Sequence, residues 1–133
     1  MTFAAKTLFT GKTHNISGPN GGTRSADGTL DLKLPDPHPA AENLFGAAWS
    51  ACYMGAIQLA ARQANLILPA LPEVDAEITL NLAGTEFFLR ARLDVALPGL
   101  DRAIGEQLIE AAHKICPYSK AVHGNIDVVT TLV

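Results

Sequence analysis

This chain has little of what marks several common classes of protein. Its 133 residues include only two cysteines, too few for the disulfide framework of a small secreted domain. Ten Lys and Arg residues against 13 Asp and Glu residues give a net charge of −3, without the basic excess that nucleic acid or an acidic membrane attracts. No apolar run approaches the roughly 20 residues of a membrane span, and the start lacks the features of a signal peptide. We therefore expect a cytoplasmic protein without a nucleic-acid or membrane partner.

The composition is apolar for a soluble protein. Hydrophobic residues make up 48% of the chain and charged residues only 17%. A chain of this length can bury a core as one domain, so we predict a single domain over residues 1–133. The apolar excess also predicts that a partner subunit covers part of the surface.

The N-terminal part predicts extended segments followed by a long helix. Thr7–Ile16 and Thr23–Leu34 are predicted to be extended, around a turn at Ser17–Gly22 that is rich in residues favouring tight reversals. Pro35–Pro39 interrupts regular structure. Ala41–Leu66 has no internal proline and is apolar almost all round, which predicts a buried central helix.

The C-terminal part predicts a hairpin, a second helix and a last strand. Val74–Leu82 alternates apolar and polar residues, and Phe87–Leu97 does the same after a short turn. Asp101 is a plausible N-cap for a helix that ends near Ile115, and Asn125–Val133 is predicted to be a strand. The predicted order is ββαββαβ, an α+β domain in which antiparallel sheet covers the helices.

The two cysteines are the residues with the clearest chemical potential. A free cysteine is commonly a small buried hydrophobic residue, so two of them need no function in themselves. Their surroundings are more informative. Cys52 ends the segment ENLFGAAWSAC, and Cys116 lies within AAHKICPYS. Both segments resemble the active-site motifs of the Ohr/OsmC family, the thiol-dependent reductases of organic hydroperoxides, and the terminal GNIDV extends the resemblance.

This resemblance runs from Thr7 to Val133 and implies both a fold and a function. The implied fold is the OsmC-like fold of the Ohr branch, an intertwined homodimer whose antiparallel sheets wrap around central helices. The implied function is that of a peroxidase protecting against oxidative stress: Cys52 attacks the peroxide, becomes a sulfenic acid and condenses with Cys116 to a disulfide. Family members reduce this disulfide with a dihydrolipoyl group, which implies a lipoylated protein as reductant. No metal, flavin or haem cofactor is expected.

Electrostatics favours the same assignment of the two thiols. A reactive thiol needs a pKa lowered by positive charge or by a helix N-terminus, and neither cysteine is predicted to lie near such an end. Cys116 is predicted at a helix C-terminus, where the helix dipole disfavours a thiolate. We therefore predict that Cys52 is the attacking thiol and Cys116 the resolving thiol.

Activation of Cys52 requires a cation that the sequence does not supply in the usual place. In the Ohr branch an arginine in the first turn supplies it, held by a glutamate that matches Glu42. An ungapped comparison puts Pro19 where that arginine belongs. Arg24 could take the role with a shifted loop, although a solvated strand residue is the more common use of such an arginine. Lys12 could do so less well, because an ammonium cannot bind a carboxylate and a peroxide in a fork. A slow or retuned enzyme is the third alternative.

The spacing of Glu42 and Cys52 bears on the assembly. Ten residues separate them, about 15 Å along a straight helix. Either the helix is broken between them or Glu42 serves the cysteine of another subunit. The second alternative agrees with the homodimer, which we expect.

Other functions compete with the peroxidase. A dimer of this fold could bind a small apolar ligand or sense redox state through a Cys52–Cys116 disulfide without useful turnover, and the loss of the turn arginine favours this. A general stress protein of the OsmC branch would share the cysteines and differ in peroxide preference. A metal site of Cys52, His113 and Cys116 lacks a fourth ligand with recognisable spacing, and we predict no metal.

Overall fold

The structure is a computed structural model that describes residues 4–37 and 39–133. Along the chain it forms two compact units, Met1–Ala41 and Glu42–Val133, and each is described on its own. The described elements follow the order βββαββααβ, so the α+β class is confirmed, with one strand and one helix more than the sequence predicted. The single domain over residues 1–133 stays a prediction.

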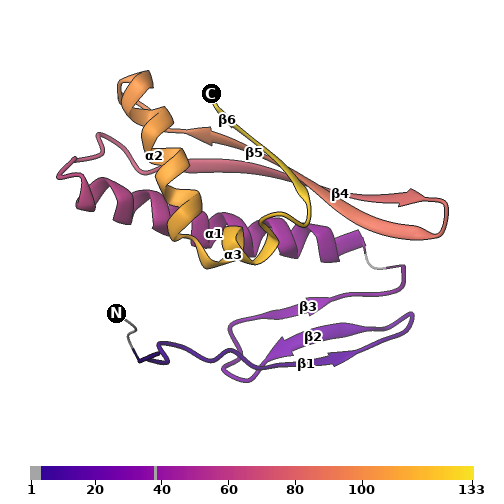
Figure 1. Ribbon diagram of the computed structural model, residues 1–133. Helices are drawn as coiled ribbons and strands as arrows, with labels where there is room; N and C mark the ends of the chain where they lie inside the picture. Colours follow the sequence, from indigo (N-terminus) through magenta and orange to yellow (C-terminus); the bar gives the residue numbers. More distant parts are fainter. Residues whose placement is uncertain (1–3, 38) are drawn as a thin grey trace. The chain divides into compact units, whose positions relative to one another are not determined.

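The first unit carries an antiparallel sheet of three strands in the order β1-β2-β3 (Figure 1). The strands are β1 (Thr13–Ile16), β2 (Gly22–Ser25) and β3 (Asp31–Lys33). The prediction of one extended segment over Thr23–Leu34 is wrong, because the chain reverses between β2 and β3.

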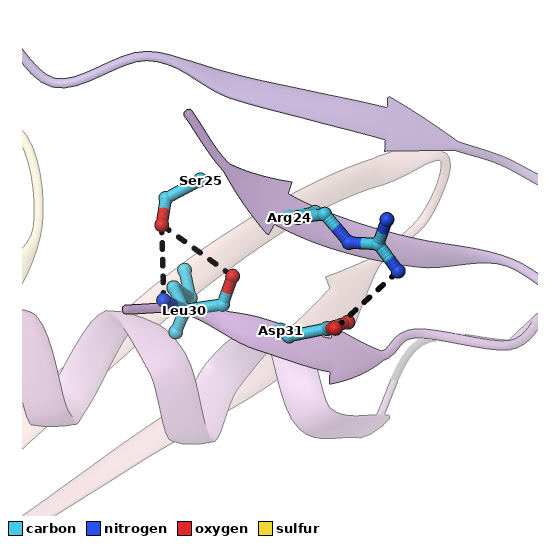
Figure 2. A network of polar contacts seen from close by, with 4 residues as sticks. All are labelled: Arg24, Ser25, Leu30 and Asp31. Carbon is cyan, nitrogen blue, oxygen red and sulfur yellow. Dashed lines mark hydrogen bonds and ion pairs between the residues drawn. The ribbon is translucent and has the colours of Figure 1, made fainter. Parts of the chain in front are cut away.

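Asp27 makes this reversal. Its Oδ1 accepts hydrogen bonds from Ser25 Oγ at 2.6 Å, from Thr29 N at 3.1 Å and from Thr29 Oγ1 at 2.8 Å. Gly28 has φ +79°, a conformation that costs glycine little. Ser25 Oγ also binds the backbone of Leu30 on the opposite side of the turn (Figure 2). An Asp-Gly pair between strands is a strong turn signal, and it decides the local structure here.

The turn predicted at Ser17–Gly22 is confirmed and contains Pro19. Gly21 N donates to Gly18 O at 3.0 Å, so Pro19 occupies the second position of a tight turn, where its fixed φ is favoured. A Cβ on Gly21 would lie 2.6 Å from the carbonyl oxygen of Ile16 and 2.7 Å from that of Leu34. Only glycine fits at that position.

The second unit is built on the long helix α1 (Pro39–Gln63), which confirms the helix predicted over Ala41–Leu66 with slightly different ends. One face of α1 is buried and carries Trp49, Tyr53 and Ile57, each at most 1% exposed. Another face is exposed, and its middle part carries small residues: Ala47, Ala48, Ala51 and Gly55. By length and composition alone α1 could span a membrane, but it is the core helix of this unit.

Three strands form the sheet of the second unit, in the order β4-β5-β6. β4 (Glu73–Ala83) and β5 (Glu86–Ala96) form the predicted antiparallel hairpin. β6 (Asp127–Leu132) pairs with β5 in parallel, so the expectation of purely antiparallel sheets is wrong for this pair. The chain reaches β6 through helices, the crossover that a parallel pair requires.

Those helices are α2 (Arg102–Ile115) and α3 (Pro117–Val122). Asp101 is the N-cap of α2 as predicted, since its Oδ2 accepts from Ala103 N at 3.1 Å and from Ile104 N at 3.3 Å. α3 was not predicted. Pro117 does not simply close α2, because it is also the first residue of α3, the helical position that proline favours.

Candidate active site

The structure brings the two cysteines together in the second unit. Cys52 lies in the middle of α1 and is partly exposed, whereas Cys116 lies between α2 and α3 and is fully buried. Both are free thiols, and the Cys116 side chain lies close enough to Cys52 to raise the pKa of its thiol. The arrangement is a solvent-reachable thiol with a second thiol buried beside it.

Cys116 caps two helices at once. Its backbone N–H donates to Ala112 O at 2.8 Å and closes α2, while its Sγ accepts from Ser119 N at 3.5 Å and caps α3. The sequence placed Cys116 only at a helix C-terminus and no cysteine near an N-terminus. Its place at the C-terminus of α2 is confirmed, but Cys116 is also the N-cap of α3, so the prediction that neither cysteine lies near a helix N-terminus is wrong.

The backbone N–H groups of Tyr118 and Ser119 interact with different sulfurs. Pro117, the first residue of α3, has no N–H to offer. The next N–H, that of Tyr118, interacts with Cys52, and the following one, that of Ser119, binds Cys116. Sequence reasoning missed this arrangement. The signal was the Pro-Tyr-Ser that follows Cys116, which is typical of a helix start as well as of a helix end.

The pKa of the Cys52 thiol is raised above its ordinary value. Burial is the largest cause, and the neighbouring Cys116 adds to it, while the Tyr118 N–H acts in the opposite direction. In this environment Cys52 rests as the protonated thiol at neutral pH. The thiolate is the nucleophile, so rapid attack on a peroxide requires a further group that lowers this pKa.

A network of buried and half-buried polar side chains adjoins the thiols. Ser119 Oγ accepts from Trp49 Nε1 at 3.0 Å and lies 2.8 Å from His113 Nδ1. His113 Nε2 lies 2.8 Å from Thr130 Oγ1 on β6. Burial lowers the pKa of His113, so the ring is neutral at neutral pH. The prediction that Trp49 is mainly a core residue is confirmed, and its indole N–H also donates to this network.

Tyr53 joins the network to the core. Its hydroxyl donates to Ile109 O at 2.7 Å, and its ring stacks on His113 with 4.3 Å between the ring centroids. Burial raises the pKa of Tyr53, and so does the nearby Cys116. The phenol therefore stays protonated beside the thiol pair.

A cavity of about 720 Å³ opens on the polar network. Its apolar walls come from the segment after α3 and from β6, its polar floor includes the network, and basic side chains lie among its lining residues. Neither cysteine lines it. The lining residues are Trp49, Glu110, His113, Lys114, Ser119, Lys120, Val122, His123, Gly124, Ile126, Val128 and Thr130.

Glu42 lies on the same helix as Cys52. α1 is continuous from Pro39 to Gln63, so the alternative of a helix broken between Glu42 and Cys52 is excluded. The two residues stay about 15 Å apart along one chain. Within this unit Glu42 does not join the thiol pair.

Arg24, the candidate replacement for the turn arginine, lies on β2 of the first unit. Its Nη2 pairs with Asp31 Oδ2 on β3 at 3.4 Å, and both side chains are largely exposed (Figure 2). An exposed cross-strand ion pair is worth little energy, so Asp31 does not fix this guanidinium firmly. The contact agrees with the interpretation of Arg24 as a solvated strand residue.

The ring of His113 offers no lone pair to a metal between the sulfurs. Both of its nitrogens lie at hydrogen-bonding distance from hydroxyl groups, of Ser119 and of Thr130. Among the described residues no group of three His, Cys, Asp or Glu side chains has the geometry of a metal site.

Comparisons with known proteins show the family to which this chain belongs. The sequence profile of the OsmC-like protein family matches residues 34–131. The chain belongs to the Ohr/OsmC family. The organic hydroperoxide resistance protein of Xanthomonas axonopodis pv. citri is 35% identical over 141 residues, covering 99% of each chain. The organic hydroperoxide resistance protein OhrB of Bacillus subtilis is 34% identical over 131 residues, covering 91% of this chain and 95% of the relative.

Solved structures of the family share the fold. The crystal structure of Bacillus subtilis OhrB matches with a TM-score of 0.85 and 34% identity, over 96% of this chain and 100% of that one. An organic hydroperoxide resistance protein from Legionella pneumophila matches with a TM-score of 0.86 and 31% identity, over 96% and 98%. The predicted OsmC-like fold is therefore confirmed.

Proposed function

We propose that this protein is a cysteine-based peroxidase that reduces organic hydroperoxides to alcohols. The observation that carries the proposal is the pair of adjacent free thiols, one partly exposed on α1 and one buried at the start of α3. The relatives named as organic hydroperoxide resistance proteins support the substrate class and the role in resistance to these compounds.

The proposed cycle uses both sulfurs. The Cys52 thiolate attacks the distal oxygen of the hydroperoxide, the O–O bond breaks, and the alcohol leaves with a proton while Cys52 becomes a sulfenic acid. Cys116 then attacks the Cys52 sulfur, forming the disulfide and releasing water. A dithiol of the dihydrolipoyl type, carried by a lipoylated protein, reduces the disulfide by thiol–disulfide exchange. The cycle needs no resident cofactor, because the sulfur carries the electrons.

Activation of Cys52 is proposed to come from outside its own unit. The groups that shift its pKa within the unit leave the thiol protonated. Glu42 lies too far along the continuous α1 to act on the cysteine of its own chain. We therefore propose that Glu42 of a second copy acts at Cys52, in a homodimer, and positions a cation there.

Apolar surface in the second unit supports this dimer. The outer half of the β4–β5 hairpin is apolar and exposed, with Leu80 at 55%, Leu82 at 59% and Phe87 at 69%. The exposed small-residue face of α1 also allows close packing. Surface of this kind is typical of a covered interface. We place the protein in the cytoplasm, where reduced thiols persist.

The test is the rate of Cys52 oxidation. Reduced protein is mixed with cumene hydroperoxide or hydrogen peroxide, and Trp49 fluorescence and free thiols are followed in wild type and Cys52→Ser. Rapid oxidation by the organic peroxide, lost in Cys52→Ser, is the expected result. Thiols that persist in wild type would contradict the proposal and favour a scaffold that binds apolar ligands.

The missing turn arginine can be restored as a second test. Pro19→Arg places a guanidinium where the family has one, and Pro19→Gln is the matched neutral control. If Cys52 lacks its usual cation, Pro19→Arg raises the oxidation rate about tenfold, the effect of one pKa unit on the thiolate fraction, and Pro19→Gln does not. Arg24→Gln shows whether Arg24 already serves, since it then slows wild type by a similar factor.

A further inference from the structure

We propose that His113 is a positioning residue for disulfide formation: through Ser119 it holds the first turn of α3 against the sulfur of Cys116. The inference deepens the proposed function and rests on it. It assigns His113 to the second step of the cycle, in which Cys116 attacks the oxidised Cys52, and not to the attack on the peroxide.

The hydroxyl of Ser119 connects three helices. Trp49 Nε1 on α1 lies 3.0 Å from Ser119 Oγ, and His113 Nδ1 on α2 lies 2.8 Å from the same oxygen. An indole N–H can only donate, so Ser119 accepts from Trp49 and has its own proton to give. Among the described residues, the acceptor in contact with that hydroxyl is His113 Nδ1.

This order of donors sets the tautomer of His113. Because Nδ1 accepts, Nε2 carries the proton and donates to Thr130 Oγ1 on β6 at 2.8 Å. Burial keeps the ring neutral, as this tautomer requires. Tyr53 stacks on one face of the ring, with an angle of 29° between the two planes. The imidazole is held at both nitrogens and on a face, so it can hold Ser119 in turn.

The backbone of the same serine binds the resolving sulfur. Ser119 N donates to Cys116 Sγ at 3.5 Å, and the preceding N–H, of Tyr118, interacts with Cys52. Pro117 contributes no N–H, so these are the first donors that α3 has. A shift in the first turn of α3 would therefore change how the Cys116 sulfur faces Cys52.

Disulfide formation is the step that depends most on this geometry. The Cys116 sulfur attacks the Cys52 sulfur, the S–S bond forms as the S–O bond breaks, and the oxygen leaves as water with the proton from Cys116. The Cys116 sulfur must approach in line with the S–O bond of the oxidised Cys52, and a fixed α3 holds it in place for that approach. Attack on the peroxide is governed mainly by the pKa of Cys52, and His113 is not among the groups that shift this pKa within the unit.

Three substitutions of His113 separate its contacts. His113→Asn keeps an acceptor oxygen near the place of Nδ1 and so keeps Ser119. His113→Gln keeps a donor nitrogen near the place of Nε2 and so keeps Thr130. His113→Phe keeps the stacking on Tyr53 and loses both hydrogen bonds. If the ring acts through Ser119, only the Asn variant keeps a rate of disulfide formation near that of wild type.

Two rates are measured for each variant. Single-turnover loss of cumene hydroperoxide in a Cys116→Ser background gives the peroxide step, and the decay of dimedone-reactive sulfenic acid in the two-cysteine protein gives the disulfide step. We expect the Phe and Gln variants to slow the disulfide step about tenfold, the Asn variant to stay within about threefold of wild type, and the peroxide step to change by less than about threefold. Equal effects of Asn and Gln, or parallel loss of both rates, would overturn the inference.

Ser119→Ala serves as the second variant, because it removes the hydroxyl and leaves His113 in place. It should slow the disulfide step as much as His113→Phe does, and the double variant should slow it no further. Additive effects of the two substitutions on this rate would contradict the proposal that His113 acts through Ser119. Circular dichroism confirms that the rates refer to folded protein.

Failure of the proposed function is distinguishable from failure of this inference. If the Cys116→Ser protein consumes no hydroperoxide, the proposed function fails. Diamide then oxidises the thiol pair instead, since it takes up two hydrogens as the Cys52–Cys116 disulfide forms. The same order, with Asn close to wild type and Gln and Phe slow, is expected with diamide, and loss of that order would overturn the inference alone.

Discussion

The second unit of this chain has a hydrophobic core, and the first has almost none. Trp49, Tyr53, Ile57 and Leu93 are fully buried in the second unit, whereas among the described residues of the first only Gly21 and Thr23 are buried. The first unit is held by turns and cross-strand hydrogen bonds. The thiol pair lies where packing can hold two sulfurs to a fixed geometry, and Pro19 lies where packing holds little.

Deleting equal side chains in the two units should give the largest difference. Leu93 on β5 is fully buried and Leu32 on β3 is 41% exposed. Leu93→Ala leaves a cavity and should lower the free energy of unfolding by about 2–5 kcal/mol, against about 1 kcal/mol or less for Leu32→Ala. Urea unfolding measures both. Equal losses would show that Leu32 is as well packed as the core, through a partner or otherwise.

The two tyrosines offer a second comparison, within the thiol region itself. Tyr53 donates to Ile109 O at 2.7 Å and is fully buried, whereas Tyr118 is 49% exposed. Tyr53→Phe leaves a buried carbonyl without its donor and should cost about 1–3 kcal/mol of unfolding free energy. Tyr118→Phe should change it by less than about 0.5 kcal/mol. A costly Tyr118→Phe would indicate a partner for that hydroxyl in the assembly.

The elements with strong periodicity could be predicted from the sequence, and the short ones could not. The long apolar helix, the β4–β5 hairpin and the Asp101 cap were all predictable, because each repeats or pairs a clear signal. The β2–β3 reversal was missed because the alternation of Leu30, Leu32 and Leu34 favours an extended segment, whereas the hydrogen bonds of Asp27 reverse the chain just before it. The parallel β6 depends on a crossover that no local pattern states.

The same division holds for the site. The resemblance of two motifs pointed to Cys52 and Cys116, and the structure brings them close enough for Cys116 to raise the pKa of Cys52. The role of α3 was not predictable by propensity, because a helix of six residues gains little from its own hydrogen bonds. Ser119 and Thr130 entered the site only through folding, since their partner His113 lies on another element.

His113 should make the free energy of unfolding of the second unit depend on pH. Burial lowers the pKa of His113 below its ordinary value of 6.5, so the folded protein binds fewer protons there than the unfolded chain does. Its contribution to stability is therefore complete above about pH 6.5 and is lost as the pH falls through the lower folded-state pKa. Denaturant unfolding between about pH 7.5 and pH 5 should show this slope in wild type and less of it in His113→Phe. His14→Gln, on the exposed β1, is the control; a slope unchanged by His113→Phe would contradict the account.

The smallest effect is expected at Asp27 in the first unit. Hydrogen bonds from Ser25 and Thr29 lower the pKa of this carboxyl from 3.8 to about 2. Its stabilising contribution is present above about pH 3.8 and is lost as the pH falls through about 2. Asp27→Ala should speed amide hydrogen exchange in the β2–β3 turn and leave the second unit unchanged. Faster exchange throughout α1 would show that the turn supports more than its own sheet.

The central claim is that Cys52 and Cys116 form one disulfide for each organic hydroperoxide reduced. Fully reduced protein is treated with one equivalent of cumene hydroperoxide, free thiols are counted, and the protease-digested protein is searched by mass spectrometry for linked peptides. The account predicts loss of both thiols, one equivalent of alcohol, and a link between Cys52 and Cys116 of the same chain. Alcohol without that link, or thiols that survive the peroxide, would contradict it.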